Sequence, residues 1–102
     1  MDRDRAIAVL RAHEAELRAA GVSGLSIFGS VARGEADDGS DVDVLVQLQD
    51  EPGAGGFRHF ERLDDLSRRL AGLLGRPVDV VAEPVAKERL RRAIGEHRAV
   101  AF

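Results

Sequence analysis

Cysteine, tryptophan, tyrosine and threonine are absent from this sequence of 102 residues. Without cysteine the chain has neither disulfides nor thiolate ligands for a metal. No apolar run approaches the roughly 20 residues that would span a bilayer. The amino-terminal residues also lack the basic-then-apolar pattern of a signal peptide. The sequence therefore predicts a cytoplasmic protein that does not enter a membrane.

A large excess of charge of one sign is also missing. The formal net charge is −3, which gives no electrostatic reason to expect direct binding to nucleic acid. Arginine supplies almost all of the positive charge, since Lys87 is the only lysine. We expect the arginine-rich segments Arg68-Arg69 and Arg89 to Arg92 to be solvated helix faces. The length and the 44% hydrophobic content fit one domain over residues 1–102, and self-association is left open.

The sequence does contain a regular series of helical and strand patterns. Asp2 or Asp4 is positioned to cap a first helix, which Gly21 follows. The predicted helices cover residues 3–20, a leucine-rich stretch ending at about Leu74, and residues 85–96, with one helical turn at 31–35. Alternating or continuous apolar residues predict strands at 22–28, 41–48 and 78–82, and a short strand or docked segment at 99–102. The predicted fold class is α/β (α+β), a small mixed β-sheet covered by helices.

Two aspartates one residue apart stand on the second predicted strand. Residues i and i+2 of a strand project from the same face, so Asp41 and Asp43 should lie side by side. Two anions this close repel each other, which raises the pKa of at least one of them. A divalent cation such as Mg²⁺ removes the repulsion, because it prefers carboxylate oxygens together with substrate phosphates. The alternative is that both carboxylates are solvated strand residues without a task.

A third aspartate, Asp79, lies within the short apolar strand predicted at 78–82. We expect this strand to be buried, where a carboxylate is costly unless it is paired or bound to a metal. If this strand neighbours the one at 41–48, three carboxylates converge on one side of the sheet. That arrangement suits two-metal phosphoryl transfer. The alternative is that Asp79 bonds to a backbone amide or to Arg76.

Gly29 and Ser30 directly follow the first predicted strand. A glycine there lets the backbone approach an anion without a Cβ in the way, and the N–H groups that follow can hold phosphate oxygens. Ser30 adds a hydroxyl, and Arg33 could neutralise charge on a triphosphate. Taken alone, Gly-Ser is an ordinary turn, and no Walker A motif is present. In combination with the aspartates it predicts a nucleotide site.

The combined pattern resembles the nucleotidyltransferase superfamily that includes DNA polymerase beta. It consists of Gly29-Ser30, Asp41-x-Asp43 and the later strand aspartate Asp79. The fuller strings Ala32-Arg33-Gly34-Glu35 and Ser40-Asp41-Val42-Asp43 are similar to its minimal nucleotidyltransferase (MNT) branch. The resemblance covers essentially the whole chain, including the first helix and the leucine-rich helix.

The resemblance implies a metal-dependent reaction at the three aspartates. Asp41 and Asp43 would ligate Mg²⁺, in a site that takes two ions. Asp79 would complete the site and could help to deprotonate an acceptor hydroxyl. That hydroxyl would attack the α-phosphorus of a nucleoside triphosphate and release pyrophosphate.

The resemblance also implies the nucleotide-binding residues and a partner. The nucleotide-binding residues would be Gly29, Ser30, Arg33 and Ser40, with ATP as the substrate. MNT proteins of this size resemble antitoxins that transfer AMP to a tyrosine of a HEPN-domain ribonuclease toxin. This chain has no tyrosine or threonine to accept AMP, and we expect no second domain that would enclose a small acceptor. The alternatives are a non-catalytic antitoxin that masks its toxin, and transfer to a small molecule such as an aminoglycoside.

Overall fold

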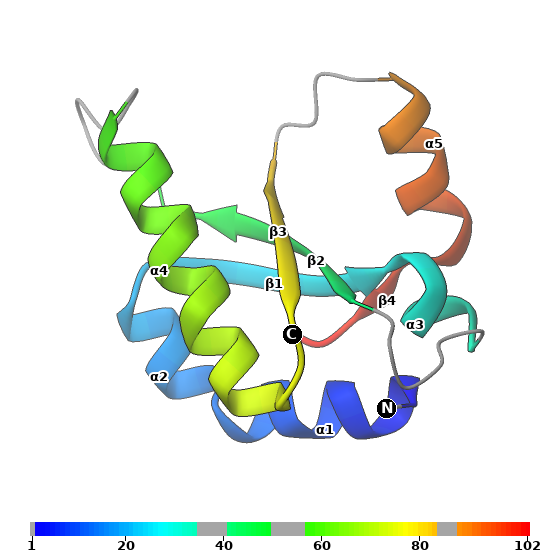
Figure 1. The fold of residues 1–102 in the computed structure, drawn as a ribbon, viewed down its shortest axis with the longest axis horizontal. Helices are drawn as coiled ribbons and strands as arrows, with labels where there is room; N and C mark the ends of the chain where they lie inside the picture. Colours follow the sequence, from blue (N-terminus) through cyan, green and yellow to red (C-terminus); the bar gives the residue numbers. More distant parts are fainter. Residues whose placement is uncertain (1, 35–40, 50–56, 84–87) are drawn as a thin grey trace.

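The computed structural model describes residues 2–34, 41–49, 57–83 and 88–102. Within these ranges the helices are α1 (Arg3–Ala12), α2 (Glu14–Ala19), α3 (Gly29–Arg33), α4 (Phe57–Leu74) and α5 (Glu88–His97). The strands are β1 (Val22–Phe28), β2 (Val42–Leu48), β3 (Val78–Ala82) and β4 (Ala99–Val100). They form one sheet in the order β3-β2-β1-β4, in which β2 and β3 are parallel and the other neighbours are antiparallel (Figure 1). The predicted mixed sheet covered by helices is confirmed.

The larger hydrophobic core lies between one face of the sheet and helices α1, α2 and α4. Leu10 of α1, Leu17 of α2 and Leu70 of α4 are fully buried there. Ile27 of β1 and Val44 of β2 meet them from the sheet. Burying a side chain of this size stabilises the fold by about 1.5–3 kcal/mol relative to leaving it exposed. This face therefore supplies most of the apolar burial that fixes the strands.

A smaller core covers the opposite face of the sheet. Ile94 of α5 is buried together with Phe28 of β1 and Leu45 of β2, and Val81 and Leu90 pack at its edge. In Figure 1, α5 stands apart from α1, α2 and α4. The smaller core explains why Phe28 and Leu45 are apolar on the face of the sheet that also carries Ser26 and Asp43.

The predicted helix over residues 3–20 is two helices. α1 ends at Ala12, α2 begins at Glu14, and His13 between them has φ −108° and ψ 17°. Leu10 of α1 and Leu17 of α2 are both buried, so the break at His13 does not expose the core. Asp2 is the N-cap, as predicted, because its side chain accepts a hydrogen bond of 2.7 Å from the backbone N–H of Arg5.

The predicted strand boundaries agree closely with the structure. β1 and β3 span the predicted residues 22–28 and 78–82. β2 begins at Val42, so Asp41 lies directly before the strand rather than in it. The short strand at the end of the chain is β4, which pairs with β1 through Val100 and Ser26.

The helix boundaries differ more from the predictions. α4 ends at Leu74, as predicted, and Gly75 follows with φ +69°. α3 begins at Gly29, earlier than the predicted turn at 31–35, because the chain turns into the helix at a residue that tolerates positive φ. α5 is confirmed from Glu88 onward, and the start predicted for it lies outside the described residues.

None of the helices in the described ranges is long and apolar enough to cross a bilayer. The cytoplasmic location stays a prediction.

Candidate active site

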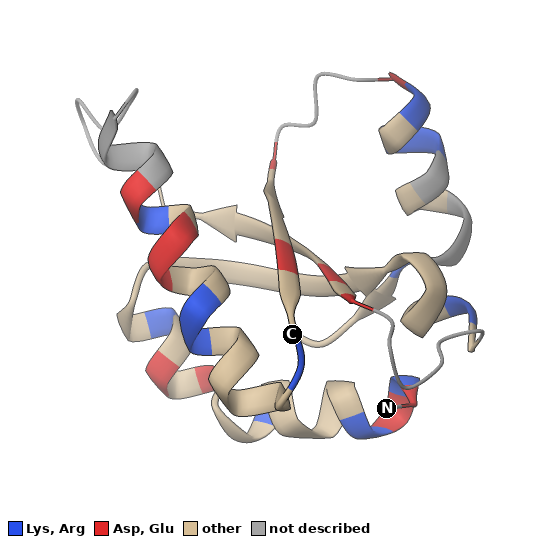
Figure 2. Cartoon of the chain, viewed as in Figure 1, with Lys and Arg blue, Asp and Glu red and all other residues tan. Residues whose placement is uncertain are grey.

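The parallel pairing of β2 with β3 brings two aspartates together. The Cα atoms of Asp43 and Asp79 are direct partners in this pair, and partner residues of adjacent strands project from the same face. Asp41 directly precedes β2 at the same end of the strand. Acidic segments of β2 and β3 accordingly lie side by side in the middle of the molecule (Figure 2). The expectation that these strands are neighbours is confirmed.

On its other side, Asp43 faces the turn from β1 into α3. Its Cα partner across the antiparallel pair is Phe28, the residue before Gly29. Gly29 has φ +72°, and a Cβ built on it would overlap Oδ2 of the Asp43 carboxylate. Glycine is therefore required here both for the backbone angle and for space. The turn predicted to approach a phosphate lies against the carboxylate predicted to hold a metal.

The pKa of Asp43 depends on its burial and on the charged groups around it. Burial of the half-buried side chain raises the pKa of Asp43 above the usual range, and the carboxylates of Asp79 and Asp41 raise it further. The Arg33 guanidinium acts in the opposite direction and lowers this pKa. The three aspartates therefore interact through space, and the fold holds Asp43 where its negative charge is unfavourable.

The prediction that Asp79 is buried is wrong. Its side chain is exposed, and β3 is an edge strand of the sheet. The continuous apolar residues around Asp79 are typical of a central, buried strand. The position of a strand in the sheet, however, depends on pairing between distant segments and cannot be deduced from these residues alone. Because the Asp79 carboxylate is exposed to solvent, it needs no metal to offset a cost of burial. Its position beside Asp43 is what makes it a candidate.

The donor set suits a divalent cation by its chemistry. Carboxylate oxygens are the ligands that Mg²⁺ prefers, and a cation beside Asp43 would relieve the repulsion from Asp41 and Asp79. As the side chains lie, however, no three acidic or histidine groups in the described part of the chain are arranged to hold one ion. The structure therefore shows adjacent acidic groups rather than a preformed cage.

The expected nucleotide-binding residues are distributed around this acidic group. Gly29 begins α3, and Ser30 follows as its second residue with a half-buried side chain. Arg33 closes α3 and is near enough to act on the charge of Asp43. Ser40 lies outside the described residues.

Sequence reasoning did not foresee that α5 lies beside the acidic group. Leu90 and Ile94, four residues apart on α5, both face inward. They cover Phe28 and Leu45, and Phe28 is the cross-strand partner of Asp43. The apolar spacing predicts an inner face for α5 but cannot say which face of the sheet receives it.

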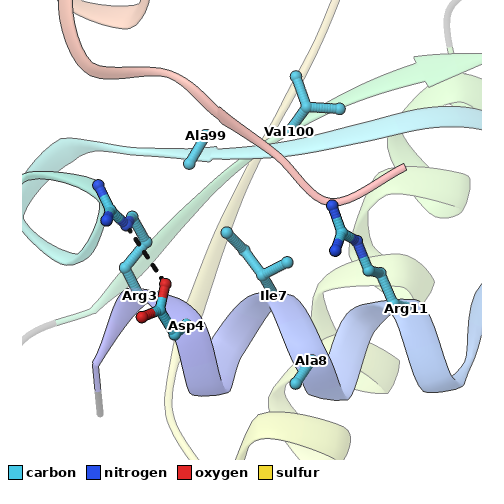
Figure 3. A pocket seen from close by; sticks show the side chains of 7 residues that line it. All are labelled: Arg3, Asp4, Ile7, Ala8, Arg11, Ala99 and Val100. Atoms are coloured by element: carbon cyan, nitrogen blue, oxygen red, sulfur yellow. Dashed lines mark ion pairs between the residues drawn. The ribbon is translucent and has the colours of Figure 1, made fainter.

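A separate hollow lies between α1 and β4. It has a volume of about 450 Å³ and is lined by Arg3, Asp4, Ile7, Ala8, Arg11, Ala99 and Val100 (Figure 3). None of the residues expected at the site lines it. The acidic group of β2 and β3 is therefore the candidate active site.

Comparison with known proteins gives the family. A model of the nucleotidyltransferase domain matches residues 10–100. The protein adenylyltransferase MntA of Thermococcus cleftensis is 37% identical over 87 residues, which cover 84% of this chain and 82% of that protein. A solved structure of a chain assigned as a minimal nucleotidyltransferase is 36% identical, with a TM-score of 0.72, over 96% of this chain and 94% of the other.

The fold also recurs at lower identity. A structure of a tri-AMPylated HEPN toxin in complex with MNT antitoxin from Shewanella oneidensis contains a chain that is 18% identical to this one, with a TM-score of 0.62. The match covers 94% of this chain and 71% of the other. At this identity the likeness concerns the fold alone. The family model and the close relatives carry the assignment, and they show that this chain belongs to the nucleotidyltransferase domain family.

Proposed function

We propose that this chain transfers AMP from ATP to a tyrosine hydroxyl of a HEPN ribonuclease toxin and thereby acts as its antitoxin. The observation that carries the proposal is the pairing of Asp43 with Asp79 beside Asp41, with Gly29 against the Asp43 carboxylate. The relative MntA is a protein adenylyltransferase, and the AMPylated HEPN toxin is held in a complex with an antitoxin of this fold. Both support protein AMPylation as the chemistry.

The three aspartates would hold two Mg²⁺ ions. Bound there, Mg²⁺ supplies charge stabilisation for the triphosphate and lowers the pKa of the attacking hydroxyl. Asp41 and Asp43 would be the main ligands, and the exposed Asp79 would complete the metal site and accept the proton of the acceptor hydroxyl. The hydroxyl oxygen forms a bond to the α-phosphorus of ATP, the bond to the bridging oxygen breaks, and pyrophosphate leaves.

The turn into α3 would bind the triphosphate. The backbone at Gly29 can approach phosphate oxygens because no Cβ intervenes. The Ser30 hydroxyl is half-buried in the same turn, and Arg33 places a positive charge near the reacting groups. Ser40 completes the proposed nucleotide-binding set.

The acceptor would come from another molecule. The sequence contains no tyrosine or threonine, so the usual hydroxyl acceptors other than serine are not available within the chain. The single domain proposed for residues 1–102 would bind ATP, and the toxin would bring its tyrosine to the exposed edge at Asp79. Binding of nucleic acid is not part of this proposal.

The test is AMP transfer from labelled ATP with Mg²⁺ to the HEPN protein encoded next to this chain. The double variant Asp41→Asn with Asp43→Asn should transfer no label and keep the circular dichroism spectrum of the wild type. A matched control is Asp64→Asn with Asp65→Asn, which removes two exposed carboxylates of α4. Full transfer by the site variant would overturn the mechanism. Neutralisation of the toxin without label would show instead an antitoxin that masks its toxin.

A further inference from the structure

Arg98 connects three segments of the chain on the face of the sheet that carries α5. Its Nε donates a hydrogen bond of 2.9 Å to Oγ of Ser26, in the middle of β1. Its NH1 lies 3.5 Å from Oε1 of Glu83, in an ion pair. Glu83 directly follows β3 and Arg98 directly follows α5. The Arg98 cluster, defined as Ser26, Glu83 and Arg98, therefore ties the end of α5 to the sheet and to the end of β3.

The cluster is held more firmly than a surface ion pair. Ser26 is only 1% exposed, so a hydroxyl that lost Arg98 could not turn to bulk water. The side chains of Arg98 and Glu83 are 36% and 30% exposed. Gln47 of β2 donates a further hydrogen bond of 2.8 Å to Oε2 of Glu83, and the lack of a side chain at Gly24 makes room for Gln47.

The helix that this cluster ties down adjoins the active site. α5 covers Phe28, Leu45 and Val81 through Leu90 and Ile94. Leu45 and Val81 are cross-strand partners, as Asp43 and Asp79 are, and each stands two residues further along its strand. Side chains two residues apart on a strand share a face. The apolar row under α5 and the acidic row are thus consecutive rows of one face.

We propose that the Arg98 cluster is a positioning device that keeps α5 docked as a wall of the nucleotide site. This inference rests on the proposed AMP transfer for its effect on catalysis, but the docking itself does not. The contacts of α5 with the sheet form only the smaller core, and α5 also packs against α3. The hydrogen bond and ion pair of Arg98 add polar contacts that hold the end of the helix to β1 and to the end of β3. Neither Arg98 nor Glu83 is among the proposed catalytic or nucleotide-binding residues, and both would act through α5.

The test uses two variants with matched controls in the full chain. Arg98→Met removes the bond to Ser26 and the ion pair, whereas Glu83→Gln removes only the charge and leaves Ser26 satisfied. The controls are Arg92→Met and Glu88→Gln. Arg92 and Glu88 form an ion pair of 3.1 Å within α5, which joins no second element and is 78% and 76% exposed. The control substitutions therefore make the same changes in charge within α5 and leave the contacts of Arg98 with Ser26 and Glu83 in place.

Two measurements are made on each variant. Backbone amides of α5 should exchange with deuterium at least about 10-fold faster in Arg98→Met, and about 3-fold faster in Glu83→Gln, while those of α4 keep the wild-type rate. The KM for ATP should rise as the docked fraction of α5 falls, about 3–10-fold for a docked fraction of about one third to one tenth, with kcat within about 2-fold of the wild type, because only the docked fraction binds nucleotide well. The controls should change neither quantity.

The outcomes separate the alternatives. A lower kcat with an unchanged KM would mean that the variants merely lose folded protein, and it would overturn the positioning role. Unchanged exchange in α5 would overturn the docking role directly. If the wild type transfers no AMP, the proposed function fails while the exchange measurement still decides whether the cluster holds α5. If exchange rises and KM does not, the helix is held by the cluster but is not a wall of the nucleotide site, and the proposal is wrong.

Discussion

Gly29 and the Asp43 carboxylate lie in contact where β1 ends and β2 begins, and the contact leaves no room for a Cβ on Gly29. The pairing of Phe28 with Asp43 enforces it, because the chain turns into α3 directly beside the carboxylate. A backbone suited to phosphate and a ligand suited to a metal are thereby placed in one position.

Gly29→Ala should abolish AMP transfer and destabilise the fold. The alanine would be strained at φ +72°, which costs roughly 1–2 kcal/mol, and its methyl group would displace the Asp43 carboxylate. Gly34→Ala is the matched control, since Gly34 has φ +74° but nothing within 4 Å of a built Cβ. Urea unfolding and transfer rates should show a similar loss of stability in the control with most of its activity retained. Equal activity in the two variants would contradict a role for the Gly29–Asp43 contact.

Asp43→Asn should raise the melting temperature of the metal-free protein near pH 7. The pKa of Asp43 is raised in the folded state by burial and by Asp79 and Asp41, so the folded protein holds this proton more tightly than the unfolded chain. The stability that the protonated Asp43 carboxyl contributes is therefore fully present below the pKa of aspartate in the unfolded chain, about 3.9. It is lost as the pH rises through the folded pKa.

The asparagine variant has no such loss, so the two proteins should melt alike well below a pH of about 3.9 and diverge as the pH rises to about 7, where the variant melts at the higher temperature. A difference of 1 kcal/mol corresponds to about 4–8 °C in a domain of this size. Mg²⁺ should narrow the gap by stabilising the wild type alone, and EDTA should restore it. A melting difference that does not change with pH would show that repulsion at Asp43 is not its cause.

The sequence was sufficient to predict the elements that carry the site. The strands at 22–28 and 78–82 are found where alternating and continuous apolar residues placed them, because the burial of a strand face repeats every two residues. The adjacency of Asp43 and Asp79 required only that the strands predicted at 41–48 and 78–82 be neighbours, a condition that the structure fulfils.

Other features depend on contacts between distant segments and could not be predicted. The helix predicted over residues 3–20 runs through His13, and neither glycine nor proline marks the break there. The exposure of Asp79 follows from the edge position of β3, which is a property of the whole sheet. The bond from Arg98 to Ser26 joins residues 72 positions apart, and neither residue belongs to a recognisable motif.

Asp79→Asn should separate catalysis from stability. Because Asp79 is exposed on an edge strand, its replacement should change the free energy of unfolding by less than about 0.5 kcal/mol. If the carboxylate accepts the proton of the acceptor hydroxyl, kcat should fall at least about 100-fold. The control is Asp64→Asn, which replaces an exposed residue of α4 and should change neither kcat nor the free energy of unfolding. Wild-type kcat in Asp79→Asn would leave Asp79 without a catalytic role.

Ile94→Ala and Leu70→Ala should destabilise different parts of the molecule. Leu70 is fully buried and Ile94 is only 4% exposed. Truncation of a buried side chain of this size to alanine normally costs about 2–5 kcal/mol of stability. Leu70 belongs to the larger core that joins α1, α2 and α4 to the sheet, whereas Ile94 belongs to the smaller core with Phe28 and Leu45. Loss of Leu70 should therefore lower the stability of the whole domain.

Loss of Ile94 can instead be met by partial detachment of α5, which leaves the larger core intact. We therefore expect Leu70→Ala to speed amide exchange throughout the strongly protected core. Ile94→Ala should speed exchange mainly in α5, lower the melting temperature less, and weaken ATP binding. If both variants instead speed exchange uniformly, the two cores unfold as one unit and α5 does not detach separately. A detachable α5 would make the nucleotide site the least stable part of the fold, since the acidic row lies next to the row that α5 covers.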